Sequence, residues 1–434
     1  MMYRSTRGAQ SVKLDDALVS GIASDGGLYL PESLPSFRPD DFSGADELKD
    51  VAYIVLEPLF KGSSLASDLE AIINETFSFP IPVVDLPVET GSCRLLELFH
   101  GPTAAFKDVG ARFLAACLVR LQGDIDYPLT ILVATSGDTG GAVAAAFNER
   151  PGIRVVVLYP DGRVSERQEQ QLTCWGDNVL SLAIQGSFDQ CQGLVKEAMA
   201  DEALTKRHRF SSANSINIGR LLPQTIYYAY SSLSNWRKNH REASFIVPTG
   251  NLGNAFACYL ARKMGLPIDR LTLATNSNRI IVDFLSGQEW LPSNSIRTLA
   301  SAMDVGNPSN MERLRADGGE ATDLAEQITA KSVSDEEIQQ DIRRNFSEFG
   351  YASCPHTATA SFVWRTLSTQ EKLAFDWILV ATAHAAKFEQ TVEPLIGEEV
   401  PVPRGLKDIL KKDSNVLQAN PSLPALAVAL DESF

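Results

Sequence analysis

The stretch LTILVATSGDTGGAVAAAF (residues 129–147) begins with an apolar run, continues through a glycine-containing turn and ends in an alanine-rich run. This order predicts a buried strand, a loop and a helix. It recurs twice: IRVVVLYP (153–160) precedes SERQEQQLTCW (165–175), with Ser165 as the expected helix cap, and ASFIVPTG (243–250) precedes NLGNAFACYLARKMG (251–265). Strands this apolar, separated by helices, favour an α/β fold whose parallel sheets are covered by helices on both faces.

The chain is expected to form three domains. Residues 1–92, rich in Gly and Pro, form a mixed N-terminal domain. The strand-then-helix pattern then runs through a small α/β domain, 93–215, and a large one, 216–434. Within the large domain, LTLATN (271–276) and DWILVATAH (376–384) predict further buried strands.

Composition excludes several classes of function. The chain has 434 residues and a net charge of −15, which disfavours nucleic acid or an anionic membrane surface as a partner. No run approaches the roughly 18 apolar residues of a membrane span. Six cysteines are scattered without a CxxC pair, and the histidines lack zinc spacing, so we expect no metal and a cytoplasmic location. The polar stretch 317–345 predicts a helical excursion on the surface.

Two glycine-containing loops, ATSGDTGGAV (134–143) and PTGNLGNAF (248–256), each follow a strand and open a helix. Backbone N–H groups converge at such a helix start and suit an anion. Neither loop is a GxGxxG fingerprint or a Walker A motif, and each alone could be an ordinary strand–helix turn. In parallel sheets, ligands bind at the carboxyl ends of the strands, where both loops are expected.

The chain also contains a lysine in an apolar context. HGPTAAFKDVGARF (100–113) places Lys107 at a helix start that favours negative charge, with Phe106 and Phe113 as core-type neighbours. Most lysines are solvated, but this one is expected to have a chemical role. A phosphate-bearing cofactor that needs a lysine is pyridoxal phosphate, whose aldehyde forms a Schiff base with the amine.

Seven motifs then occur in one order: STRG (5–8), SDGGLYLPE (24–32), FHGPTAAFKD (99–108), ATSGDTG (134–140), SANSINIGRLLPQ (212–224), PTGNLGN (248–254) and TAHAAKF (382–388). Together they resemble the threonine synthase family, in its bacterial and fungal branch. The resemblance extends from Tyr3 to about Gly397. It implies pyridoxal phosphate as the cofactor and fold type II, the tryptophan-synthase-β-like fold.

The resemblance implies a role for each motif. Lys107 would form the Schiff base and then move protons, and Thr382 would face the pyridine nitrogen. Asp138 would lie near the ring hydroxyl. The cofactor phosphate would be held by backbone amides of Gly250, Asn251, Leu252, Gly253 and Asn254. The substrate carboxylate would be cradled by Thr135, Ser136, Gly137 and Thr139. The substrate phosphate would be bound by members of the group Arg112, Ser215, Asn217, Arg163 and Arg220, since guanidinium binds phosphate bidentately.

The family converts O-phosphohomoserine and water into threonine and phosphate, and the resemblance implies this activity in a monomer. Two alternatives within the fold remain open: a phospho-lyase that makes no threonine, and a serine or threonine dehydratase. A catalytically silent ligand-binding relative is a third, although it would have no need of Lys107. Tyr227 and Tyr228 are expected to pack in the core, and His384 to orient or pack.

Overall fold

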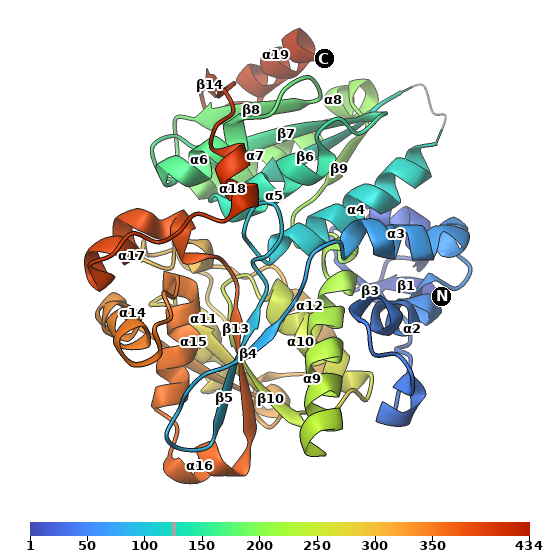
Figure 1. The fold of residues 1–434 in the computed structure, drawn as a ribbon. Coiled ribbons are helices and arrows are strands. Elements are labelled where there is room, and N and C mark those ends of the chain that lie inside the picture. The colour runs from blue at the N-terminus through green and yellow to red at the C-terminus, as the bar shows by residue number, and fades with distance from the viewer. Residues whose placement is uncertain (124–126) are drawn as a thin grey trace.

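The computed structural model describes residues 1–123 and 127–434. Figure 1 shows two α/β lobes, one above the other, with an N-terminal unit beside them. Each lobe is built on its own sheet, and the N-terminal unit carries a third. In the part of the chain described, no helix is long and apolar enough to cross a membrane.

The N-terminal unit joins a small antiparallel sheet of order β2-β1-β3 to short helices. Apolar residues of its two longer helices, among them Val55 and Ile72, are fully buried, and these helices pack on α9 and α4 of the two lobes. Its elements are β1 (Met2–Ser5), β2 (Val12–Lys13), α1 (Leu14–Ser20), β3 (Tyr29–Pro31), η1 (Pro39–Phe42), α2 (Leu48–Phe60), η2 (Ser64–Asp68) and α3 (Leu69–Thr76).

The lower lobe in Figure 1 contains a six-stranded sheet of order β12-β11-β10-β13-β5-β4, parallel except for the edge strand β4. Its strands are β4 (Val83–Asp85), β5 (Ser92–Glu97), β10 (Ala243–Pro248), β11 (Ile268–Thr275), β12 (Ile328–Ser332) and β13 (Asp376–Ala381). Every residue of the central strands β10 and β13 is buried, as their unbroken apolar runs predict.

The helices of this lobe are α9 (Thr225–Asn239), α10 (Gly253–Lys263), α11 (Ile280–Leu285), α12 (Met311–Gly318), α13 (Ala321–Ala325), α14 (Asp335–Phe349), α15 (Pro355–Arg365), α16 (Thr369–Ala374) and α17 (Glu389–Ile396), with the 3-10 turns η3 (Ile218–Arg220), η4 (Leu222–Gln224), η5 (Ser301–Met303) and η6 (Ala385–Phe388). Helices lie on both sides of the sheet in Figure 1, and α10 and α15 pack directly on its strands. Tyr227 and Tyr228 on α9 are fully buried, which confirms their predicted packing role.

The upper lobe contains a wholly parallel five-stranded sheet of order β14-β8-β7-β6-β9. Its strands are β6 (Leu129–Ala134), β7 (Ile153–Pro160), β8 (Val179–Ile184), β9 (Phe210–Ser212) and β14 (Leu417–Ala419). Its helices are α4 (Lys107–Gln122), α5 (Asp138–Phe147), α6 (Glu166–Thr173), α7 (Phe188–Ala200), α8 (Glu202–Arg207), α18 (Arg404–Ile409) and α19 (Leu423–Ser433). Ser165 caps α6 by accepting from the Gln168 amide at 3.2 Å, as predicted.

The predicted domain boundaries do not coincide with the sheets. Strand β5, expected in the small domain, pairs with β13 in the six-stranded sheet, with Cys93 opposite Trp377. Strand β14, expected in the large domain, pairs with β8 in the five-stranded sheet. An apolar run shows that a strand is buried but not which neighbour it pairs with, because that pairing is non-local. The stretch 317–345 also differs, since it contains the edge strand β12 as well as part of α14.

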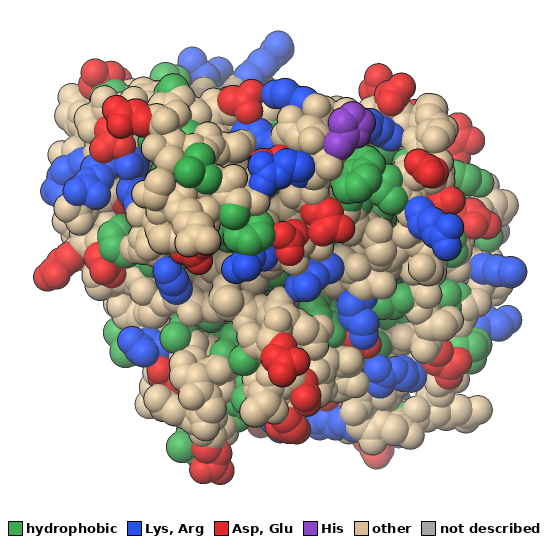
Figure 2. Space-filling model, turned by 90° about the horizontal axis from the view of Figure 1, so that it is seen from below, with side chains coloured by type: hydrophobic (Ala, Val, Ile, Leu, Met, Phe, Trp, Pro, Cys, Tyr) green, Lys and Arg blue, Asp and Glu red, His purple; other side chains and the backbone are tan. Residues whose placement is uncertain are grey.

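On the face drawn in Figure 2, acidic and basic side chains are interspersed over the surface. Both signs of charge are therefore spread over this face rather than collected in separate regions.

Candidate active site

A cavity of about 110 Å³ opens between the carboxyl ends of strands from both sheets. On this measure a single water needs roughly 10–15 Å³, so the cavity accommodates a small molecule. Ala134 ends β6, Pro248 ends β10, Thr382 directly follows β13, and all three line the cavity. The position agrees with the expectation that ligands bind at the carboxyl ends of parallel strands.

Lys107 is the first residue of α4, and its side chain, 15% exposed, reaches the cavity. Its amine lies 4.0 Å from Asp138 Oδ2 and 5.4 Å from the centre of the Phe106 ring. Burial lowers the pKa of Lys107 to about 8, although the Asp138 carboxylate opposes that shift. A substantial fraction of this amine is therefore neutral near physiological pH, as a nucleophile or base requires.

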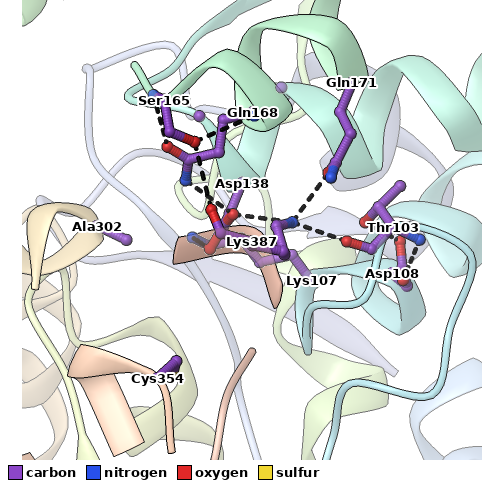
Figure 3. Close-up of polar contacts among 12 residues, drawn as sticks. Thr103, Lys107, Asp108, Asp138, Ser165, Gln168, Gln171, Ala302, Cys354 and Lys387 are labelled. Atoms are coloured by element: carbon purple, nitrogen blue, oxygen red, sulfur yellow. Dashed lines mark hydrogen bonds and ion pairs between the residues drawn. The ribbon is translucent and has the colours of Figure 1, made fainter. Parts of the chain in front are cut away.

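A second lysine, Lys387 on η6, lies against the same carboxylate (Figure 3). Its amine is 2.9 Å from Asp138 Oδ1, and the side chain is fully buried. Burial alone would raise the pKa of Asp138, but Lys387 and Lys107 hold it well below its usual range. Asp138 is thus a buried carboxylate that stays ionised between two amines.

The loop PTGNLGN (248–254) lines the cavity at the start of α10. Leu252, the N-cap of α10, adopts a left-handed conformation (φ 63°), and no described side chain caps the helix there. The Asn254 side chain is used within the loop, since it accepts from Thr249 Oγ1 at 2.8 Å and donates to the Pro248 carbonyl at 2.8 Å. Asn251 donates to Ser215 Oγ at 2.7 Å. An uncapped helix start facing a cavity suits a phosphate.

These residues fit pyridoxal phosphate. A Cβ on Gly250 would lie 2.6 Å from Met303 Cα, so the loop backbone at this position has no room for a side chain. The cavity is also lined by the amine of Lys107 and by Thr382, which directly follows the buried strand β13. Pyridoxal phosphate needs an anion cradle for its phosphate and a lysine amine for its aldehyde, and the threonine is the partner that the family resemblance implies for the pyridine nitrogen.

Most of the predicted site residues line this one cavity. They are Lys107, Thr135, Ser136, Asp138, Thr139, Ser215, Gly250, Asn251, Gly253, Asn254 and Thr382, together with Arg220, one of the candidate ligands of the substrate phosphate. Gly137 and Leu252 belong to the lining loops without lining the cavity themselves. Gly137 has φ +129°, a conformation that favours glycine, and its backbone amide donates to Thr135 Oγ1 at 3.0 Å.

Three predicted phosphate ligands lie elsewhere. Arg112 binds the Glu75 carbonyl and, at 3.0 Å, Ser78 Oγ, because a residue five positions after Lys107 is on another face of the helix. The buried Asn217 amide donates to the Leu18 and Ser212 carbonyls at 2.9 and 3.0 Å and caps η3. Arg163 is exposed and does not line the cavity. These predictions do not fit the structure.

Arg220 is the cation of that group that does reach the cavity. It is 3% exposed and donates through Nη1 to the Ala213 carbonyl, while its buried Nε has no partner among the described residues. Burial lowers the pKa of Arg220 to about 10, so it remains charged at neutral pH. A buried guanidinium with an unused donor suits an anion.

Sequence reasoning missed Lys387 and His356. His356 lines the cavity and accepts from the Ala302 amide at 3.1 Å through Nε2. Burial lowers the pKa of His356 to about 4, so the neutral ring acts as an acceptor that holds the segment carrying Ala302 and Met303. Nothing in the sequence distinguished this histidine. Lys387, however, is flanked by Ala386 and Phe388, the same apolar context that singled out Lys107. His384 caps η6 by accepting from the Ala386 amide, an orienting role as predicted.

Family models account for almost the whole chain. A model of pyridoxal-phosphate dependent enzymes matches residues 80–381, and models of the threonine synthase N terminus and C-terminal region match 2–77 and 357–427. The threonine synthase of Escherichia coli K12 is 39% identical, over 97% of this chain and 96% of its own length. This chain belongs to the threonine synthase family.

Solved threonine synthases have the same fold. The pyridoxal-phosphate-bound enzyme from Brucella melitensis superposes with a TM-score of 0.90 at 34% identity, covering 100% of this chain and 99% of that one. The yeast enzyme gives a TM-score of 0.90 at 28% identity, covering 100% and 98%. The predicted fold type II, family and pyridoxal phosphate cofactor are confirmed. Among the residues described, no group of three side chains could hold a metal ion.

The pKa of Lys107 predicts how fast this threonine synthase family member takes up its cofactor. Only the neutral amine attacks the aldehyde, and with a pKa of about 8 roughly one amine in ten is neutral at pH 7. When pyridoxal phosphate is added to the cofactor-free chain, the rate at which the absorbance of the bound cofactor returns should rise about tenfold per pH unit below pH 8 and level off above it. A free lysine derivative, measured alongside, should level off only near its ordinary pKa, about 10.4. A rate that is flat from pH 6 to 9 would contradict this assignment.

Gly250→Ala tests the phosphate cradle. The added Cβ would meet the Met303 backbone at 2.6 Å, so the loop must shift. Such overpacking costs roughly 1–3 kcal/mol, and the affinity for pyridoxal phosphate should therefore fall by about tenfold or more. Equilibrium dialysis measures the affinity. Gly176→Ala is the matched control, because nothing lies within 4 Å of its Cβ position. Equal affinities of the two variants would place the cofactor phosphate elsewhere.

Proposed function

We propose that this chain converts O-phosphohomoserine and water into threonine and phosphate, and that Lys107 is its catalytic amine. The observation that carries the proposal is that two separate groups suited to anions line the cavity that Lys107 reaches. The uncapped start of α10 lies at one part of the cavity wall, and the buried Arg220 with its unused Nε lies at another. A substrate that carries its own phosphate needs a second anion site besides that of the cofactor.

The cofactor phosphate is proposed to bind the amides of the Gly250–Asn254 loop, with Thr382 at the pyridine nitrogen. When bound, pyridoxal phosphate withdraws electrons from the substrate, so that protons on its α and β carbons become removable. Asp138 would stay ionised near the ring hydroxyl, because Lys387 and Lys107 stabilise its charge.

Lys107 Nζ is proposed to take these protons and return them where needed. Its pKa of about 8 suits both directions of transfer near neutral pH. The amine stands at the end of a flexible side chain at the start of α4, so one group reaches more than one carbon. General acid–base catalysis of this kind contributes roughly 10²–10⁴-fold to a rate.

The two anionic ends of the substrate have separate candidate sites. Ser136 and Thr139 line the cavity at the start of α5, a second helix without a side-chain cap, and suit the carboxylate. Arg220 and Ser215 suit the leaving phosphate. Ser215 Oγ accepts from Asn251 and Asn310, at 2.7 and 3.1 Å, so its own hydroxyl hydrogen remains for an anion.

The monomeric state and cytoplasmic location implied by the resemblance belong to this proposal. Sedimentation velocity of the purified chain tests the first, and a fluorescent fusion tests the second.

Lys107→Ala should lower the turnover rate by about 10³-fold or more, because both the covalent attachment of the cofactor and the proton transfers depend on this amine. The fold should persist, since the change removes a partly buried charge from a helix start where a cation gains nothing. Borohydride reduction followed by peptide mass analysis should attach the cofactor to Lys107 in the parent and to no peptide in the variant. Full activity of Lys107→Ala, without added amine, would refute the assignment.

Arg220→Ala tests the grip on the substrate phosphate. Losing a hydrogen bond to a charged group costs about 1.5–3 kcal/mol, so kcat/KM for O-phosphohomoserine should fall roughly 10- to 100-fold while cofactor affinity changes little. Arg112→Ala is the matched control, because its guanidinium lies outside the cavity. Phosphate release and amino-acid analysis are measured together. Phosphate with 2-oxobutanoate and no threonine would indicate a phospho-lyase, and ammonia from serine or threonine a dehydratase.

A further inference from the structure

Lys387 has all three hydrogens of a charged amine satisfied. Its Nζ lies 2.7 Å from the Thr103 carbonyl, 2.9 Å from Gln171 Oε1 and 2.9 Å from Asp138 Oδ1. A lysine ammonium has three donors and no acceptor, so these three acceptors match the protonated form. Figure 3 shows the three partners converging on this one amine from different parts of the chain.

The main chain around Lys387 is also fixed. Its carbonyl accepts from Ser165 Oγ at 3.3 Å, and the carbonyl of Ala386 accepts from Arg167. Both donors lie at α6 of the upper lobe, whereas η6 directly follows the lower-lobe strand β13. The charge of Lys387 is therefore held at a fixed place between the lobes.

The two oxygens of Asp138 face different partners. Oδ1 accepts from Lys387 and, at 3.1 Å, from Gln168 Nε2. Oδ2 faces Lys107 across 4.0 Å, which is longer than a hydrogen bond. The carboxylate is thus bonded to Lys387 and only electrostatically coupled to Lys107.

We propose that Lys387 is a positioning residue for Lys107: it occupies the Asp138 carboxylate and keeps its own positive charge nearby, so that Lys107 is the amine that releases its proton. This inference rests on the proposed role of Lys107. Two amines share one carboxylate: the ammonium of Lys387 is bonded to three acceptors, while Lys107 is left in a mainly cationic surrounding.

The other charged groups near Lys107 either lower its pKa as well or are hydrogen-bonded to other parts of the chain. Burial is the largest cause of the lowered pKa of Lys107. The positive charges of Lys387 and Arg220 lower this pKa further, and the Asp138 carboxylate opposes the shift. His356 is neutral and accepts from a backbone amide. The carboxylate of Asp108 accepts from Thr103 N and Oγ1 at 2.9 and 2.6 Å and shows no bond to Lys107. Asp138 is therefore the anion that opposes the loss of the proton from Lys107.

Lys387→Met removes the charge and retains most of the side-chain length. Asp138 would then be free to pair with Lys107, and an opposite charge at this range raises the pKa of an amine by roughly one to three units. We expect the pKa of Lys107 to rise by about one unit or more, which lowers the neutral fraction at pH 7.5 by roughly tenfold. Trace acetylation of the full-length cofactor-free chain with acetic anhydride, followed by peptide mass analysis, reads the titration of Lys107 directly. In the holoenzyme, the pH profile of kcat should shift the same way.

Two variants separate charge from structure. Lys387→Arg keeps the charge and should leave the titration of Lys107 close to that of the parent. Gln171→Leu removes one hydrogen bond to Lys387 without changing any charge, so it should weaken the lobe contact without shifting the titration. An unshifted titration in Lys387→Met, or an equal shift in Gln171→Leu, would overturn the inference.

A folding defect in Lys387→Met would not end the test. Asp138→Asn leaves Lys387 with neutral acceptors only. The pair Asp138→Asn with Lys387→Met removes both charges together. The double variant should titrate at Lys107 at a higher pH than Asp138→Asn alone, and equal titrations would overturn the inference. The acetylation readout does not depend on substrate. It therefore stands even if O-phosphohomoserine proves not to be the substrate, an outcome that the product analysis detects separately.

Discussion

One buried carboxylate, Asp138, facing two lysines organises the centre of this molecule. The three groups come from the starts of α4 and α5 and from η6, positions 107, 138 and 387 of the chain. An isolated charge buried at this depth costs several kcal/mol, and the cost is offset only if partners approach closely with good geometry. The elements that carry these side chains must therefore converge, and with them the carboxyl ends of both sheets.

Where the fold follows from local pattern, the sequence was sufficient to predict it. The apolar runs of β6, β7, β10 and β13 are buried parallel strands, because a strand covered on both faces needs an unbroken apolar run. The glycine-containing loops after β6 and β10 line the cavity, because the carboxyl ends of parallel strands share one edge. Lys107 was identified by an apolar context that a solvated lysine would not have.

The rest depended on contacts between distant residues. The neighbours of β5 and β14 are set by pairing across hundreds of residues, so the domain boundaries could not be derived from the order of motifs. Arg112 was predicted to face the cavity, but it lies on another face of α4, because it follows Lys107 by five residues. Lys387 shared the local signal of Lys107, but its meaning lies in partners up to 284 residues away. A side chain's role in a site is decided by what approaches it, which local sequence does not encode.

The residues at positions 138 and 387 are physically coupled. With asparagine at 138, the fully buried ammonium of Lys387 would keep only neutral acceptors, and its burial would become costly. With an apolar residue at 387, Asp138 would hold Lys107 as a closed ion pair, and the amine would lose the neutral fraction on which proton transfer depends. The Lys387–Asp138 ion pair also joins η6 to the upper lobe, as does the hydrogen bond from Ser165 to the Lys387 carbonyl. A substitution that changes the charges of the site therefore also changes the contact between the two lobes.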